Sequence, residues 1–167
     1  NGWPKYIDHT SFHDFFILQE LGRTVDGYRS SSFMYKDKNT FNWAAKLHAG
    51  PMWDFNLSFG NADYCDAEIT TGWQYQFDQI CNFSTEIPFW WERLLEDPGY
   101  ANGLRCRWEE LRQGPLKTST MHAYIDSVAN HIEEARIRNF QRWPIIGVYV
   151  NWNGFVGQTY QQDLNFF

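Results

Sequence analysis

Apolar side chains recur every three to four residues in several parts of the chain, and this spacing places them on one face of a helix. The pattern predicts helices over residues 9–22, 89–95, 100–112 and 118–143. We expect Asp8 to cap the first helix and Gly22 to lie near its end. Thr118 or Ser119 is expected to cap the last and longest of them, and a further helix begins near Tyr160.

Two short aromatic or apolar stretches predict strands, at residues 31–36 and 45–49. A polar turn follows the first and Gly50-Pro51 stops the second, so the two strands should pair as a hairpin. The stretch from Asn61 to Glu86 has no periodicity and predicts a long ordered loop. Together these patterns predict one α+β domain over residues 1–167, predominantly helical, with a small β-hairpin.

Composition narrows the classes of partner. Aromatic residues make up 19% of the chain, including nine Trp, which indicates a packed aromatic interior, an aromatic-lined groove, or both. The net charge of -6 provides no basic field for nucleic acid or anionic lipid, so a nucleic-acid partner is not expected. No run of 18 apolar residues occurs, and therefore no transmembrane segment is expected.

The three cysteines, Cys65, Cys81 and Cys106, contain no CxxC pair and do not suggest a zinc site. A disulfide between Cys65 and Cys81 is consistent with an oxidising compartment. Free buried thiols are the equally weighted alternative.

Two acidic residues are the main candidates for a functional site, because each stands among Gly, aromatic and amide residues. Asp26 occurs in Val25-Asp26-Gly27-Tyr28, and Asp54 in Trp53-Asp54-Phe55-Asn56. Because the predicted hairpin lies between them, it should bring both acids to the same end of the domain. Paired acids can cleave glycosides, bind a metal ion, or support phosphoryl transfer. The alternative without chemistry is that Asp26 is a turn residue and Asp54 a buried helix cap.

For phosphoryl transfer, Asp26 would accept the hydroxyl proton and Asp54 would bind Mg²⁺. The amide oxygens of Asn56 and Asn61 could add hard-oxygen ligands. Arg29 could contact phosphate or form a structural ion pair with Asp26.

Three stretches carry a family resemblance: Thr24-Val25-Asp26-Gly27-Tyr28-Arg29, Phe33-Met34-Tyr35-Lys36-Asp37, and the run from Gly50 to Asn61 that contains Trp53-Asp54-Phe55-Asn56. With these motifs the chain resembles the CotH kinase family, named after spore coat protein H. The later Pro88-Phe89-Trp90-Trp91-Glu92-Arg93-Leu94 and Arg138-Asn139-Phe140-Gln141-Arg142-Trp143-Pro144 resemble versions of this family in exported bacterial proteins. The resemblance covers nearly the whole chain.

The resemblance implies an atypical protein kinase that uses ATP and Mg²⁺ to phosphorylate Ser or Thr of a protein, with a protein-kinase-like C-terminal lobe. Asp26 matches the catalytic acid and Asp54 the metal-binding acid. Arg29 and Asn61 are cofactor-binding candidates from their chemistry beside these acids, not from the resemblance. Asn56 departs from the family, because many members have a second Asp there, and Ser30-Ser31-Ser32 stands where many have Asn.

No Gly-rich nucleotide loop or P-loop occurs, so the chain is expected to be the C-terminal part of a larger protein and nearly inactive alone. The resemblance and the possible Cys65–Cys81 disulfide imply that this protein is exported. The alternative is a non-catalytic relative that binds protein or glycan at a cell surface. Its ligand would lie on loop aromatics such as Trp43, Trp73 and Trp152.

Overall fold

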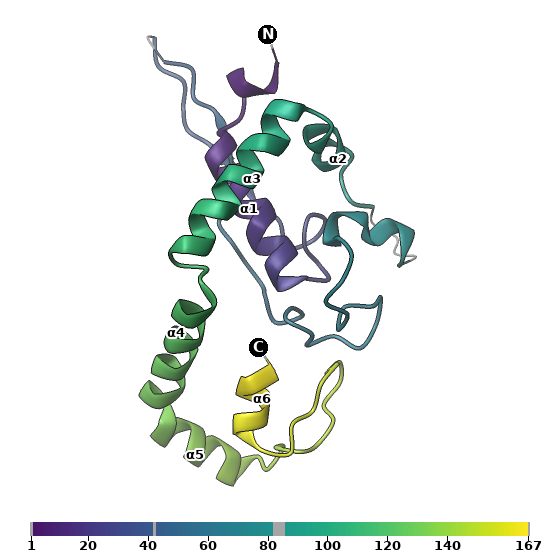
Figure 1. The fold of residues 1–167 in the computed structure, drawn as a ribbon, viewed down its shortest axis with the longest axis vertical. Coiled ribbons are helices and arrows are strands. Elements are labelled where there is room, and N and C mark those ends of the chain that lie inside the picture. The colour runs from purple at the N-terminus through teal and green to yellow at the C-terminus, as the bar shows by residue number, and fades with distance from the viewer. Residues whose placement is uncertain (1, 42, 82–85, 167) are drawn as a thin grey trace.

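The computed structural model describes residues 2–41, 43–81 and 86–166 (Figure 1). Its helices and strands, in chain order, are η1 Trp3–Lys5, α1 His9–Gly22, β1 Met34–Lys36, β2 Leu47–Ala49, η2 Gln74–Gln79, α2 Trp90–Leu95, α3 Pro98–Gln113, α4 Thr118–His131, α5 Glu133–Arg142 and α6 Tyr160–Phe166. The predicted α+β class, mostly helical with one small sheet, is confirmed. Within the described residues, no helix has the length and apolar content needed to cross a membrane.

Helix α1 begins and ends where the sequence predicts. The Asp8 carboxylate accepts a hydrogen bond from the Ser11 backbone N–H at 2.9 Å, and so caps one of the free donors of the first turn. After Gly22 the chain enters the left-handed conformation at Arg23, with φ 46° and ψ 49°. The Arg23 N–H then donates to carbonyls of the last turn, and the chain leaves the helix directly toward Asp26.

The core is built from aromatic rings that α1 presents to α2 and to the Asp26 turn. The Phe15 ring stacks on Trp91, with ring centres 5.3 Å apart. Tyr28 packs edge-on against the same indole at 5.0 Å. Trp91 is almost fully buried, whereas its neighbour Trp90 is exposed. The expected aromatic interior is therefore present, and of the Trp pair only Trp91 belongs to it.

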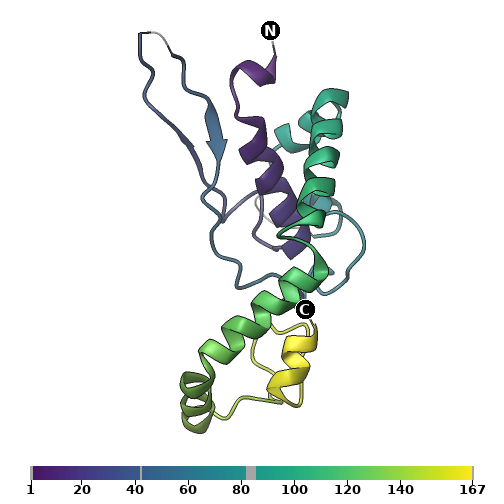
Figure 2. The same ribbon diagram turned by 60° about the vertical axis from the view of Figure 1, so that its left-hand side comes forward.

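Helices α1 and α3 lie side by side (Figure 2), joined by a two-point ion pair. Arg107 Nε donates to Asp14 Oδ1 at 2.7 Å and its Nη2 donates to Oδ2 at 3.1 Å. On the same face His13 is buried against the Tyr100 ring, with ring centres 4.6 Å apart.

The predicted hairpin forms, but its strands are shorter than expected. β1 pairs antiparallel with β2, with Met34 opposite Ala49 and Lys36 opposite Leu47. Leu47 also exchanges backbone hydrogen bonds with the segment before α1, since Asp8 N–H donates to its carbonyl at 2.8 Å. The hairpin base is thereby fixed to the start of α1, and the chain turns away at Gly50-Pro51.

The single helix predicted over residues 118–143 is wrong, because the structure has two helices there. Ile132, with φ −96° and ψ 8°, separates α4 from α5. Glu133 and Glu134 then occupy the first turn of α5, where acids favour a new helix start. The expected Ser or Thr cap is also wrong: Lys117 is the N-cap of α4 and makes no side-chain capping bond. No residue of α4 or α5 is buried.

The C-terminal segment returns from this helical arm toward the body of the molecule (Figure 1). The β-branched run of residues 145–150 contains a turn at 146–147 and forms no strand, and α6 follows as predicted. The Arg136 guanidinium lies 4.3 Å above the Tyr160 ring, so α5 and α6 are packed together. Phe166 at the end of α6 stacks on Phe155, with ring centres 4.3 Å apart.

Candidate functional site

Asp26 lies in a compact turn that follows α1. Its carbonyl accepts backbone hydrogen bonds from Ser30 and Ser31, both at 3.1 Å, and its side chain is half-buried. Gly27 stands at the tightest point, because a Cβ built there would lie 2.4 Å from Gln19 Oε1 and 2.9 Å from the Thr24 carbonyl. The turn therefore places Asp26 rigidly at the end of α1.

Asp54 lies in an irregular segment that follows the hairpin. It is exposed, has a φ of 62°, and belongs to no helix, so the alternative of a buried helix cap is wrong. For the same reason it lacks the apolar enclosure that a glycosidase acid needs. The two acidic segments contact each other: Val25 N–H donates to the Leu57 carbonyl at 3.1 Å, and Ser31 Oγ donates to Asp54 Oδ2 at 3.4 Å.

Arg29 belongs to the Asp26 side of this contact. Its Nη2 donates to the Val25 carbonyl at 2.7 Å, and this hydrogen bond joins the two ends of the turn that contains Asp26. Burial lowers the pKa of the guanidinium, and the charges of Asp26 and Asp78 act in the opposite direction. Burial, together with the charge of Asp26, raises the pKa of Tyr64. Asp26, Arg29, Tyr64 and Asp78 therefore share one electrostatic environment.

Asn56 and Asn61 lie on the Asp54 side. Asn61 Nδ2 donates to the Asn56 carbonyl at 2.7 Å, and Asn61 Oδ1 accepts from Asn153 Nδ2 at 2.5 Å. Both ends of the Asn61 amide are thus engaged by protein atoms. The Asn56 side chain is exposed beside Asp54.

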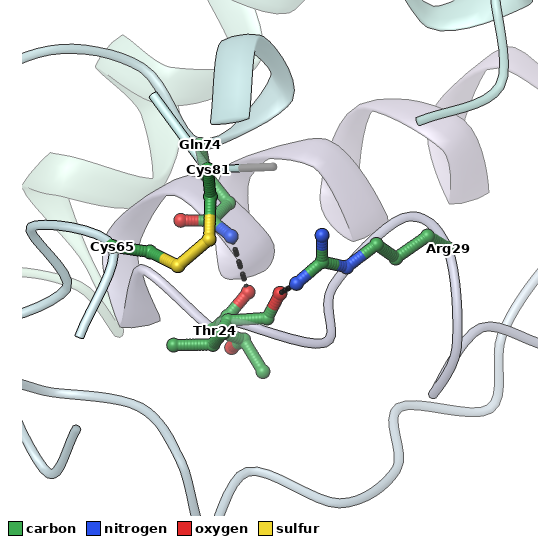
Figure 3. Close-up of a disulfide and its surroundings, with 6 residues drawn as sticks. Thr24, Arg29, Cys65, Gln74 and Cys81 are labelled. Atoms are coloured by element: carbon green, nitrogen blue, oxygen red, sulfur yellow. Dashed lines mark hydrogen bonds between the residues drawn. A yellow bond between two sulfur atoms is a disulfide. The ribbon is translucent and has the colours of Figure 1, made fainter. Parts of the chain in front are cut away.

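A disulfide joins Cys65 to Cys81, with Cα atoms 5.1 Å apart, within the usual range (Figure 3). The chain between them carries η2, whose first residue, Gln74, reaches the Asp26 turn. Gln74 Nε2 donates to the Thr24 carbonyl at 2.5 Å, as Figure 3 shows. The long loop predicted between residues 61 and 86 is therefore ordered in its described part, and it supports the Asp26 turn through the hydrogen bond from Gln74 to Thr24.

Glu20 holds the same loop from α1. Its carboxylate accepts from Tyr28 Oη at 2.7 Å, from Gln74 N–H at 2.7 Å and from Tyr75 N–H at 3.0 Å. Burial raises the pKa of Glu20, and these three hydrogen bonds oppose the shift.

The sequence-based interpretation missed Glu20, Gln74 and Tyr64. One signal was available for Glu20, which stands four residues after Phe16 and so lies on the buried face of α1. No local pattern marks Gln74 or Tyr64, because each acts on residues about 40 to 50 positions earlier in the chain.

The donor atoms fit the chemistry of Mg²⁺ with a nucleotide. Mg²⁺ in phosphoryl-transfer sites is held by one or two carboxylates together with phosphate oxygens and water, so Asp54 with the amide oxygen of Asn56 is a sufficient protein contribution. The exposure of both side chains leaves room for phosphate and water. Among the residues described, no cluster of three or more His, Cys, Asp or Glu side chains forms a separate metal site.

A family model described as CotH kinase protein matches residues 1–165. No curated protein and no solved structure matches the chain.

Proposed function

Since this chain belongs to the CotH kinase protein family, we propose that it carries the phosphoryl-transfer site of an atypical protein kinase. The kinase would use ATP and Mg²⁺ and modify Ser or Thr of a protein substrate. The contact between the two acidic segments carries the proposal. Val25 N–H and the Leu57 carbonyl are 3.1 Å apart, and Ser31 Oγ and Asp54 Oδ2 are 3.4 Å apart, so both acids can serve one site.

Each residue has a proposed role. Asp26 receives the proton of the substrate hydroxyl, whose oxygen forms the new bond to phosphorus while the bond to ADP breaks. Asp54 and Asn56 hold Mg²⁺, which when bound offsets the negative charge of the phosphates. Arg29 contacts phosphate, and because it also donates to Val25 it links that contact to the turn of Asp26.

Asn61 has a proposed positioning role next to the cofactor, which it exerts through Asn56. It donates to the Asn56 carbonyl, and we propose that this bond holds the Asp54–Asn56 segment in place. Ser31 has a comparable role on the opposite side, through its contact with the Asp54 carboxylate.

Calorimetric titration with Mg-ATP tests the proposal. On the 167-residue chain, and on the natural gene product where that is longer, we expect Asp54→Asn to weaken Mg-ATP binding at least tenfold. Asp37→Asn removes an acid in the hairpin turn that is also exposed, and should change nothing. In the gene product, Asp26→Asn should retain binding and lose phosphoryl transfer. Binding and transfer that are both unaffected by Asp54→Asn would refute the assignment.

A second candidate function is favoured by the exposed loop indoles. Trp43, Trp73 and Trp152 are 51%, 53% and 50% exposed, and large exposed aromatic side chains are suited to binding sugars or protein partners. A non-catalytic surface protein would bind a glycan or peptide array whether or not Asp54 is present, and would lose binding when these Trp residues are changed to Ala.

Export is proposed from the Cys65–Cys81 disulfide, because such bonds persist in oxidising compartments. Alkylation of free thiols in the protein as isolated from its native compartment should modify Cys106 and leave Cys65 and Cys81 unmodified until reduction. Modification of all three without reduction would count against export.

A further inference from the structure

A cavity of about 470 Å³ lies between the loop of residues 55–61 and the C-terminal segment. Its wall is mostly apolar and includes Phe59, Ile145, Val148, Val150, Phe155 and Phe166. The acid in this wall, Asp163, accepts a hydrogen bond from the Gly157 N–H at 2.8 Å, so its carboxylate already serves the fold. The cavity is therefore suited to an apolar group.

The cavity is contiguous with the proposed catalytic site. Phe55 and Asn56 line it, and they directly follow Asp54. Two residues span at most about 7.6 Å between Cα atoms, so the cavity wall begins within that distance of Asp54. An extended peptide advances about 3.3 Å per residue. A peptide whose hydroxyl lies in the proposed site shared by Asp26 and Asp54 would thus place a side chain one to three residues away in the cavity.

We propose that this cavity receives an apolar side chain of the protein substrate, one to three residues from the Ser or Thr that donates its proton to Asp26. The inference rests on the proposed function and adds a specificity to it. A Leu, Ile, Val or Phe side chain would exchange water for the aromatic and branched wall. A Glu or Asp side chain would lose its hydration without a cation in the wall to replace it.

Cavity volume alone does not lead to this assignment. A larger cavity, of about 600 Å³, lies between α1 and α3 and is lined by Trp73 and Trp108. Neither Asp54 nor Asp26, nor a direct chain neighbour of either, contributes to its wall. The smaller cavity is the one that adjoins the acidic motif.

Peptide binding to the 167-residue chain tests the inference without requiring catalysis. Fluorescent nonapeptides with a central Ser carry Leu, Ser or Glu at each position from three before to three after it, and fluorescence anisotropy measures their dissociation constants. We expect Leu at one of these positions to tighten binding about tenfold over Ser, as burial of a side chain of this size predicts.

The variant Val150→Asp places a charge in the cavity wall and should abolish the preference for Leu. Its matched control is Val128→Asp on α4, because both valines are 43% exposed and Val128 does not line the cavity. Val148→Asp, at a wall position that is 52% exposed, gives a second test if Val150→Asp does not fold, as judged by circular dichroism.

The outcomes separate the inference from the function. Equal binding of the Leu, Ser and Glu peptides, or a Leu preference that survives the wall variants, would overturn the inference even if Asp54-dependent phosphorylation occurs. A Leu preference that is lost with Val150→Asp and kept with Val128→Asp supports it. If that result appears while no phosphoryl transfer depends on Asp54, the cavity binds apolar side chains, but the proposed function fails and the bound peptide is not a kinase substrate.

Discussion

Removal of the Cys65–Cys81 disulfide should have two effects. It should destabilise the protein, and it should loosen the loop that supports the Asp26 turn. In the loop-entropy estimate, opening a cross-link between residues 16 positions apart costs about 3 kcal/mol of unfolding free energy. The double variant Cys65→Ser, Cys81→Ser should lower the unfolding free energy by about this amount. Reduction of the wild type should give the same shift, because it removes the same constraint from the unfolded chain.

The assay is urea unfolding followed by Trp fluorescence, with Cys106→Ser as the matched control. Cys106 is exposed and forms no disulfide, so its replacement should leave the unfolding midpoint unchanged. Under conditions that populate the native state, amide hydrogen exchange adds a local measurement. The Gln74 and Tyr75 amides donate to Glu20 and should exchange faster in the double variant, since the disulfide closes the loop that carries them.

Three results would refute this reasoning. A loss of unfolding free energy below about 1 kcal/mol in the double variant would mean that other contacts do the work of the disulfide. Such contacts would hold the loop in the native state and restrain it in the unfolded state. Unchanged protection of the Gln74 and Tyr75 amides would mean that Glu20 alone positions the loop. A comparable loss in Cys106→Ser would show that the effect comes from thiol removal and not from the cross-link.

Three further predictions concern the frame of the site. Asp8→Ala should lower the free energy of unfolding by about 1 kcal/mol at neutral pH, as measured by urea unfolding. The cap bond lowers the pKa of the Asp8 carboxyl below 3.8 in the folded state. The stabilisation by Asp8 is therefore present above pH 3.8 and disappears as the pH falls through the lower folded pKa. Burial lowers the pKa of His13 below 6.5, so stability should fall on acidification from about pH 6.5, and His13→Gln should flatten that dependence in a pH series of unfolding midpoints. Gly154→Ala would bring a Cβ to 2.3 Å from the Gly60 carbonyl oxygen and should cost about 1–3 kcal/mol, whereas Gly114→Ala, whose nearest atom is 4.0 Å away, should not produce this loss in the same unfolding assay.

Local signals predicted the elements that depend on local contacts. Asp8 and Gly22 mark the ends of α1, and the structure has both a cap and a left-handed exit there. Gly50-Pro51 correctly marks the end of the hairpin.

The break in the last predicted helix could not be inferred from apolar spacing, because Val128, Ile132 and Ala135 continue the pattern through it. The acidic pair Glu133 and Glu134 was the one local sign of a new helix start. Since α4 buries no residue, its apolar positions do not report tertiary packing in this structure, and the pattern therefore could not distinguish one helix from two.

The sequence supplied candidate residues for the site but not their contacts. Asp26 and Asp54 stood out by their neighbours, whereas the bond between Ser31 and Asp54 depends on how the hairpin folds back. The Asn61 amide oxygen is a candidate ligand in the sequence, but in the structure it accepts from Asn153, in a segment that no local pattern connects to it.

The bond between Asn153 and Asn61 also has a consequence for the order of events during synthesis. Its two residues are 92 positions apart. At a translation rate of about 5–20 residues per second, the loop beside Asp54 emerges roughly 5–20 s before its partner exists. Through that interval α1 and the hairpin can already be folded, while the wall formed by residues 145–166 is still missing. The nascent chain thus exposes Phe55 and Phe59 to chaperones at the stage when the acidic motif is already complete.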